Sequence, residues 1–138
     1  MITTEGATYL AGAGVKGTTP VTQWYVFPIK GNYTPTPADV AATFPTLAQE
    51  STAYEGSTRA TITFGTVTAG AVDNSAAPTT LTATADETWY GVGVSSVPTK
   101  GALTGVLLHV QRFATPRAMT TGSNLQVLVE LELVQPTP

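Results

Sequence analysis

Hydrophobic and polar residues alternate along much of this chain, and a period of two is the pattern of strands with one buried face. Residues 125–134 give the clearest example, since five apolar side chains point one way while Gln126, Glu130 and Glu132 point the other. Residues 58–68 show the same alternation, with threonines on the polar face. Both segments are predicted to be half-buried strands.

Further segments rich in valine, threonine and aromatic residues also favour strands. Pro28 cannot donate a hydrogen bond, so we expect its strand to lie at a sheet edge or to kink. Gly91 and Gly93 indicate a bulge or close packing of another backbone. Six or seven short strands at roughly ten-residue spacing predict an all-β chain, an antiparallel β-sandwich or jelly roll. These further strands are predicted at residues 23–30, 79–85, 88–94 and 103–113.

The first 22 residues differ from the rest because they are rich in glycine, alanine and threonine. They are predicted to form an extended N-terminal arm, mobile when alone and able to lie across a neighbour in an assembly. Its isolated apolar anchors are Ile2, Tyr9 and Leu10. Residues 23–138 are then predicted to form a single β-sandwich or jelly-roll domain.

One short helix is predicted at residues 36–44. Thr36 is suited to cap it, Pro37 to its first position and Asp39 to its positive end, while Pro45 ends it. The tail at residues 135–138 is predicted to be a frayed end.

The composition argues against catalysis. The 138 residues include 27 threonines but only one histidine, no cysteine and nine acidic side chains. Enzymes bring nucleophiles, bases or metal ligands together, and this chain has few of them. We therefore expect no enzyme activity, no cofactor and no metal.

The charge pattern bears on possible partners. Net charge is −3, and the six basic residues are scattered, which argues against nucleic acid. No apolar run approaches the roughly 18 residues of a membrane span, and the start of the chain lacks the pattern of a secretion signal. Only 11% of the residues are charged while 42% are hydrophobic. This indicates either a surface partly covered by a protein partner or a neutral surface rich in threonine and serine.

The few ionisable residues give weak candidates for chemistry. His109 lies in a predicted strand without a nearby carboxylate in sequence, so a structural or surface role is favoured. Asp86 and Glu87 are adjacent but supply too few oxygens for calcium. Glu130 and Glu132 share a strand face at a spacing compatible with glycosidase carboxyls, yet no cleft or sugar-stacking residues are apparent around them.

The segment AQESTAYEGSTRA carries the remaining candidates. Glu50 and Arg59 are placed to pair across a turn near Gly56. This pairing is either a brace within the loop or part of a contact ridge for a partner that includes Tyr54. The candidate partner-interface residues of the chain are accordingly Ile2, Tyr9, Leu10, Tyr54 and Arg59.

Several short motifs in order resemble small structural proteins of tailed bacteriophages over residues 23–134. They are the strand Trp24-Tyr25-Val26, the segment Thr36-Pro37-Ala38-Asp39, the spaced residues Glu50, Thr52 and Tyr54, and the pair Thr58-Arg59. The N-terminal segment matches nothing in that pattern. The resemblance implies a jelly-roll or immunoglobulin-like fold and, for some members, a role as capsid decoration or cement protein.

The resemblance thus predicts a virion protein on the capsid surface that bridges major capsid protein subunits, as a homo-oligomer such as a dimer or trimer. A first alternative is a phage tail or head-fibre component. A second is a carbohydrate-binding β-sandwich module, in which Trp24, Tyr25, Trp89 and Tyr90 form a stacking platform. Each of these Trp-Tyr pairs lies inside a strand, so one ring of each is expected to face the core.

Overall fold

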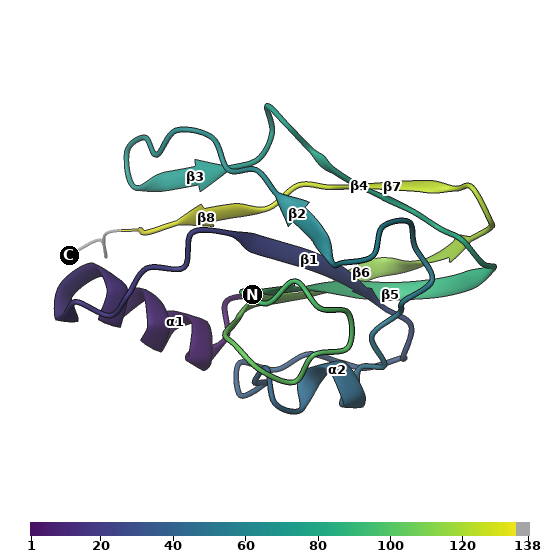
Figure 1. Ribbon diagram of the computed structural model, residues 1–138, viewed down its shortest axis with the longest axis horizontal. Helices are drawn as coiled ribbons and strands as arrows, with labels where there is room; N and C mark the ends of the chain where they lie inside the picture. Colours follow the sequence, from purple (N-terminus) through teal and green to yellow (C-terminus); the bar gives the residue numbers. More distant parts are fainter. Residues whose placement is uncertain (135–138) are drawn as a thin grey trace.

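Two layers of antiparallel strands make up the part of the chain that the computed structural model describes, residues 1–134 (Figure 1). The larger layer is a four-stranded sheet with strand order β2-β1-β5-β6; the smaller consists of two two-stranded ribbons, β3-β8 and β4-β7. The predicted all-β, antiparallel, sandwich-like fold is confirmed. In chain order the elements are α1 (Thr4–Ala11), a π-helical turn η1 (Gly12–Lys16), β1 (Trp24–Ile29), α2 (Phe44–Leu47), β2 (Ala60–Ile62), β3 (Ala71–Asp73), β4 (Thr79–Thr82), β5 (Glu87–Ser95), β6 (Leu107–Met119), β7 (Asn124–Val127) and β8 (Glu130–Glu132).

Apolar side chains cover both faces of the four-stranded sheet. One face packs against the ribbons, and Trp89 and Val94 are fully buried there. The other face packs against α2 through Phe27, Phe44 and Val110. Burial on both faces explains why the central strands carry near-continuous apolar residues, whereas the outer ribbons alternate.

Pro28 does not place its strand at an edge, contrary to expectation, because β1 lies between β2 and β5. The carbonyl oxygen of Pro28 accepts a hydrogen bond from the main-chain N–H of Ser51 (2.9 Å). Because N and C=O of one strand residue face the same side, the proline nitrogen also faces away from β5. Its missing N–H therefore leaves the β1–β5 ladder intact, and β2 pairs only with residues 24–26.

The glycines of β5 have the roles that the sequence indicates. The register of β5 against β6 shifts between Trp89 and Gly91, which marks a bulge. A Cβ at Gly91 would lie 2.2 Å from the carbonyl oxygen of Gln111, and one at Gly93 would lie 2.5 Å from Cζ of Phe27. Both glycines therefore allow close approach, the first by a backbone and the second by an aromatic ring.

The prediction of an extended arm over residues 1–22 is wrong for its first half. Residues 4–11 form α1, and the hydroxyl of Thr3 caps it by accepting a hydrogen bond from Gly6 N (2.9 Å). A Cβ at Gly6 would lie 2.5 Å from Leu108 O, so glycine lets the helix sit directly on β6. The sequence pattern does not predict this helix, because the helix is short and its apolar residues show little helical periodicity.

Other contacts fix the N-terminal segment to the body of the chain. Val110 N donates to Met1 O (2.9 Å), which extends the outer edge of β6 by a short stretch of backbone. The carboxylate of Glu5 accepts hydrogen bonds from Leu107 N (2.7 Å) and Ala41 N (2.9 Å). The segment is therefore part of the packed structure and not a free arm.

The helix predicted at residues 36–44 is also wrong in its position. Turns occupy most of that range, and the helix α2 begins at Phe44. Asp39 instead accepts a hydrogen bond from Thr36 N (2.7 Å) and one from the Tyr33 hydroxyl (2.6 Å). Pro45 lies in the first turn of this one-turn helix, where proline is tolerated, and does not end a helix as the sequence predicts.

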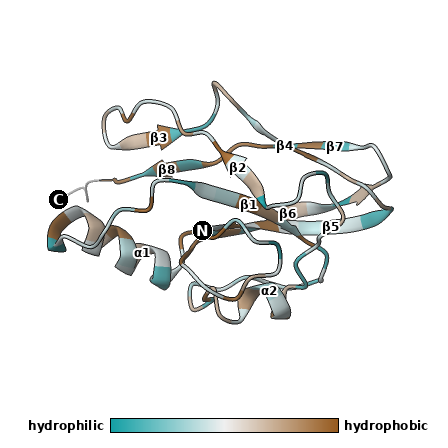
Figure 2. Cartoon of the chain, viewed as in Figure 1, coloured by the Kyte–Doolittle hydropathy of each residue, from teal (hydrophilic) through white to brown (hydrophobic). Residues whose placement is uncertain are grey.

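The strand predicted at residues 125–134 is interrupted. β7 ends at Val127 and β8 begins at Glu130, but the alternation continues through the break, with Val127 and Val129 buried and Gln126 exposed. Figure 2 shows hydrophobic and hydrophilic residues alternating along β7. The tail predicted at residues 135–138 lies outside the described residues.

Candidate functional site

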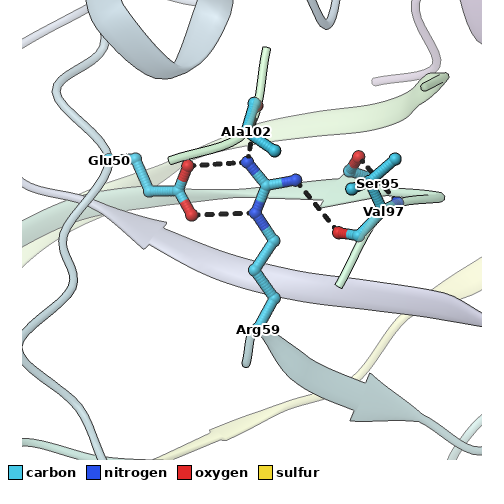
Figure 3. Close-up of polar contacts among 5 residues, drawn as sticks. All are labelled: Glu50, Arg59, Ser95, Val97 and Ala102. Carbon is cyan, nitrogen blue, oxygen red and sulfur yellow. Dashed lines mark hydrogen bonds and ion pairs between the residues drawn. The ribbon is translucent and has the colours of Figure 1, made fainter. Parts of the chain in front are cut away.

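Arg59 and Glu50 form a buried ion pair (Figure 3). Arg59 donates from Nη2 (2.7 Å) and Nε (2.8 Å) to the two carboxylate oxygens, and the side chains are 1% and 2% exposed. The guanidinium also donates to the carbonyls of Val97 and Ala102, and it lies 4.3 Å from the ring centroid of Phe27. The pair is a brace that ties the start of β2 to two loops.

The Tyr54 side chain also packs inside the protein. Its ring packs edge-on to Trp89 at 6.5 Å between centroids, and the Lys100 ammonium lies 3.7 Å from its centroid. The hydroxyl is buried without a hydrogen-bond partner within the described residues, and burial raises the pKa of this phenol. Tyr54 and Arg59 are thus enclosed by the chain itself, so neither presents a side chain at its surface.

Ile2, Tyr9 and Leu10, the other predicted interface residues, are half-buried against the core between the layers. Tyr9 packs edge-on to Trp24 at 5.4 Å between centroids, and its hydroxyl accepts a hydrogen bond from Val21 N. Ile2 and Leu10 also border an exposed apolar groove, described below. Of the five predicted interface residues, these two line that groove.

His109 lies beside the N-terminal amine. Its Nε2 is 2.6 Å from the nitrogen of Met1, and its backbone is bridged to Ile2. Burial, and to a lesser extent the adjacent ammonium, lowers the pKa of His109 to about 4. The imidazole is therefore neutral near pH 7 and serves as a structural contact.

The adjacent acidic residues Asp86 and Glu87 are occupied by internal bonds. Glu87 accepts hydrogen bonds from the Ser51 hydroxyl and from Trp89 Nε1 (3.0 Å), while Asp86 accepts one from Thr121 N (2.9 Å). Within residues 1–134, no three histidine, cysteine or acidic side chains gather in a way that would hold a metal ion.

The aromatic pairs do not form the stacking platform of a sugar site. Trp24 and Trp89 belong to the core between the layers and are 9% and 0% exposed. This confirms the expectation that one ring of each pair faces inward. Tyr90 packs against the opposite core, and the Arg112 guanidinium lies 5.5 Å from its ring centroid.

An apolar cleft of about 330 Å³ opens between the layers. It exists because the layers are unequal in width: four strands face ribbons that are two strands wide. β4 sits over β2, where the Thr79 hydroxyl donates to Thr61 O (3.0 Å), so the ribbons leave the β6 side uncovered. The cleft is lined by Val92, Val94, His109, Gln111, Phe113 and residues 125–130.

A second apolar groove, of about 540 Å³, lies beside the residues that directly follow the cleft-lining residues 125–130 in sequence. Residues 131–133 form one wall, and α1 with η1 forms the other. Figure 1 shows α1 beside the end of β8. Exposed apolar side chains mark this end of the molecule, among them Val15 (81%) and Leu133 (74%). The cleft and this groove follow one continuous chain segment, residues 125–133, which we call the open edge.

The backbone of the open edge is paired on one side only. Val129 N donates to the Asn74 side chain (2.7 Å), Asn74 Nδ2 donates to Val127 O (3.1 Å), and Leu133 N donates to Gly70 O (2.9 Å). Strand residues alternate the direction of their N–H and C=O groups. The groups of the even-numbered residues, Gln126, Leu128, Glu130 and Glu132, therefore face away from β3 and β4, where no strand of residues 1–134 is paired with them.

The outward side chains of the open edge combine acidic residues with one apolar residue. Glu130 is paired directly with Asp73 across the β3–β8 ladder, and Asp73 keeps its charge because hydrogen bonds from Ser75 lower its pKa. Two residues further on, Glu132 is also exposed. Leu128 is 65% exposed between these acids and Gln126.

Leu128 is the residue that the sequence-based prediction passed over. Burial alternates along this segment, but residue type does not, because Val127-Leu128-Val129 is an apolar run. The apolar Leu128 falls on the outward row with Gln126, Glu130 and Glu132. An apolar side chain at an outward strand position is the signal that marks this surface in the sequence.

Comparison with known protein-family models and with curated proteins finds no match to this chain. No helix within the described residues is long and apolar enough to cross a membrane.

Proposed function

We propose that this protein is a structural component of a tailed-bacteriophage particle, a decoration or cement protein that binds the capsid exterior and bridges major capsid protein subunits. The observation that carries the proposal is the open edge with its apolar cleft and groove. The sequence resemblance supplies the class of particle, and the open edge supplies a surface suited to assembly.

The open edge has the two properties that a docking surface needs. Its unpaired N–H and C=O groups offer main-chain hydrogen bonds. The cleft offers apolar surface whose burial contributes roughly 25 cal/mol per Å². Monomeric proteins seldom leave large apolar patches exposed beside an unpaired edge, and such patches mark interaction sites.

A cement role also agrees with the way this chain uses its charged residues. The Glu50–Arg59 pair, Glu5 and Glu87 all serve internal contacts. A protein that binds only the assembled lattice stabilises it by mass action. This requires a stable body and an accessible surface, and we propose that the body acts as a dimer or trimer on the capsid surface.

The direct test is co-sedimentation of the purified protein with phage capsids emptied of DNA, followed by heating of the capsids. The proposal predicts saturable binding and an increased resistance of the capsids to heat. Protein that stays in the supernatant at all concentrations would reject the capsid role and turn attention to the tail.

A further inference from the structure

We propose that the open edge accepts an extended segment of a partner protein as an additional strand, and that this segment alternates apolar residues with lysine or arginine. The inference rests on the proposed function only in taking this surface as the one used for assembly. It assigns the chain the role of acceptor in strand addition, whereas the sequence suggested an arm that acts as donor.

The width of the layers defines where the added strand lies. Neighbouring strands in a sheet are about 4.8 Å apart, so a strand added beside β7 and β8 lies over the uncovered β6 side. Every second side chain of that strand points into the cleft, towards Val94 and Phe113. The 330 Å³ of the cleft is the space that these apolar side chains fill.

The main chain of the open edge defines how the strand is held. Gln126, Leu128, Glu130 and Glu132 direct their N–H and C=O groups to the unpaired side, which follows from the bonds of Val127, Val129 and Leu133 on the other side. An extended segment can therefore pair along the length of the edge without disturbing any existing ladder.

Charge defines the outward residues of the added strand. Glu130 already has Asp73 directly opposite it in the β3–β8 ladder, and like charges in this arrangement are destabilising. An incoming cation on the other side of Glu130 relieves that repulsion. Glu132 lies two residues along the same face, so cations at alternate positions of the incoming segment meet both glutamates.

A second copy of this chain does not fit the same edge in this way. Antiparallel pairing of two identical edges about a twofold axis places both four-stranded sheets on the same side of the joint sheet. β6 is the outermost strand of the larger layer and lies beyond the ribbons, so the two β6 strands would meet where each cleft needs to be filled. A single extended segment has no such obstruction.

The probe for this inference is a fluorescent peptide of about ten residues, which spans residues 124–133 as a strand, with lysine and valine alternating. We expect saturable binding by fluorescence anisotropy and slowed amide exchange at Leu128 and Glu130. A matched peptide carries N-methyl groups on the amides that would face the open edge, and it should bind at least about tenfold more weakly because it loses several main-chain hydrogen bonds.

Protein variants locate the site. Leu128→Pro removes one outward N–H at an exposed position and should weaken binding of the lysine–valine peptide. Glu130→Lys should weaken it about fivefold through like-charge contact, whereas Glu55→Lys, at an exposed glutamate that lies across β4 from the open edge, should leave it unchanged. If Leu128→Pro does not fold, the N-methylated peptide tests the same main-chain bonds on the unmodified protein.

The strand-addition model is overturned if the lysine–valine peptide does not bind, or if the two peptides bind equally. It is also overturned if the Glu130→Lys and Glu55→Lys variants bind the lysine–valine peptide with equal affinity. These outcomes are separate from those of the capsid assay: peptide binding without capsid binding rejects the proposed function alone. Capsid binding that the peptide fails to compete rejects the added strand alone.

Discussion

Asn74 and Val129 form a reciprocal pair that replaces a rung of the β-ladder. Asn74 N donates to Val129 O (3.3 Å), and Val129 N donates to the side-chain oxygen of Asn74 (2.7 Å). The same amide donates through Nδ2 to Val127 O (3.1 Å). One buried side chain thus supports the backbone on both sides of Leu128 and fixes which of its groups face outward.

Replacing this amide should destabilise the protein. Asn74→Ala leaves Val129 N and Val127 O without their buried partners, and each unmet group costs about 1–3 kcal/mol. We expect a fall of at least about 2 kcal/mol in the free energy of unfolding, measured by urea denaturation. Ser75→Ala, at the exposed neighbouring position, is the control. Equal stabilities of the two variants would show that the Asn74 side chain does not support the break between β7 and β8.

Loss of the Glu50–Arg59 pair should lower the free energy of unfolding far more than loss of the exposed Lys30–Glu87 pair. The charged atoms of the second pair are 3.6 Å apart, and Lys30 is 45% exposed. Glu50→Ala leaves a buried guanidinium unpaired and should cost about 3–5 kcal/mol. Lys30→Ala should cost less than about 1 kcal/mol. Denaturation of both variants under one set of conditions checks the ranking, and similar losses would contradict the assigned burial of the pair.

Gly93→Ala should destabilise the core beneath α2. The added methyl group would lie 2.5 Å from Phe27 Cζ and 2.9 Å from Phe44 Cε1, and overpacking of this kind costs about 1–3 kcal/mol. Gly14→Ala places the same methyl group in open space and should be neutral or slightly stabilising. Thermal unfolding of the two variants distinguishes steric overlap from a general effect of losing glycine.

Lowering the pH should destabilise the folded wild-type protein, in part through protonation of His109. Its pKa is lowered from 6.5 to about 4 by burial and by the nearby N-terminal ammonium. The unfolded chain therefore binds the proton more readily, and stability falls as the pH drops from 6.5 through 4. His109→Gln should lose less stability over this range when both proteins are titrated in urea. An identical loss would assign the acid sensitivity over this range to other groups.

The fold class was readable from the sequence because alternation and turn residues are local signals. The glycines of β5 and the Glu50–Arg59 pairing were readable for similar reasons, since a bulge and a short turn involve neighbouring residues. Helix α1 was not, because its stability comes from Thr3 and Gly6 against β6, more than one hundred positions away in sequence.

The candidate site was less predictable than the fold. Periodicity shows which side of a strand is buried, but not how wide the opposite layer is or which edge stays unpaired. The sequence offers Tyr54 and Arg59 as part of a contact ridge for a partner, yet the chain encloses both side chains. Leu128 marks this surface in the sequence, because it is an apolar residue at an outward position beside glutamates of the same strand face.

If the open edge binds a phage capsid, as we propose, a charge placed on this edge should weaken the binding. Leu128→Lys and Val67→Lys place the same charge at two exposed apolar positions, 65% and 69% exposed in the wild type, and only Leu128 borders the cleft. The measurement is co-sedimentation of both folded variants with phage capsids. We expect saturable binding by Val67→Lys at the wild-type level and a clear loss of binding for Leu128→Lys. Equal binding of the two variants would contradict it.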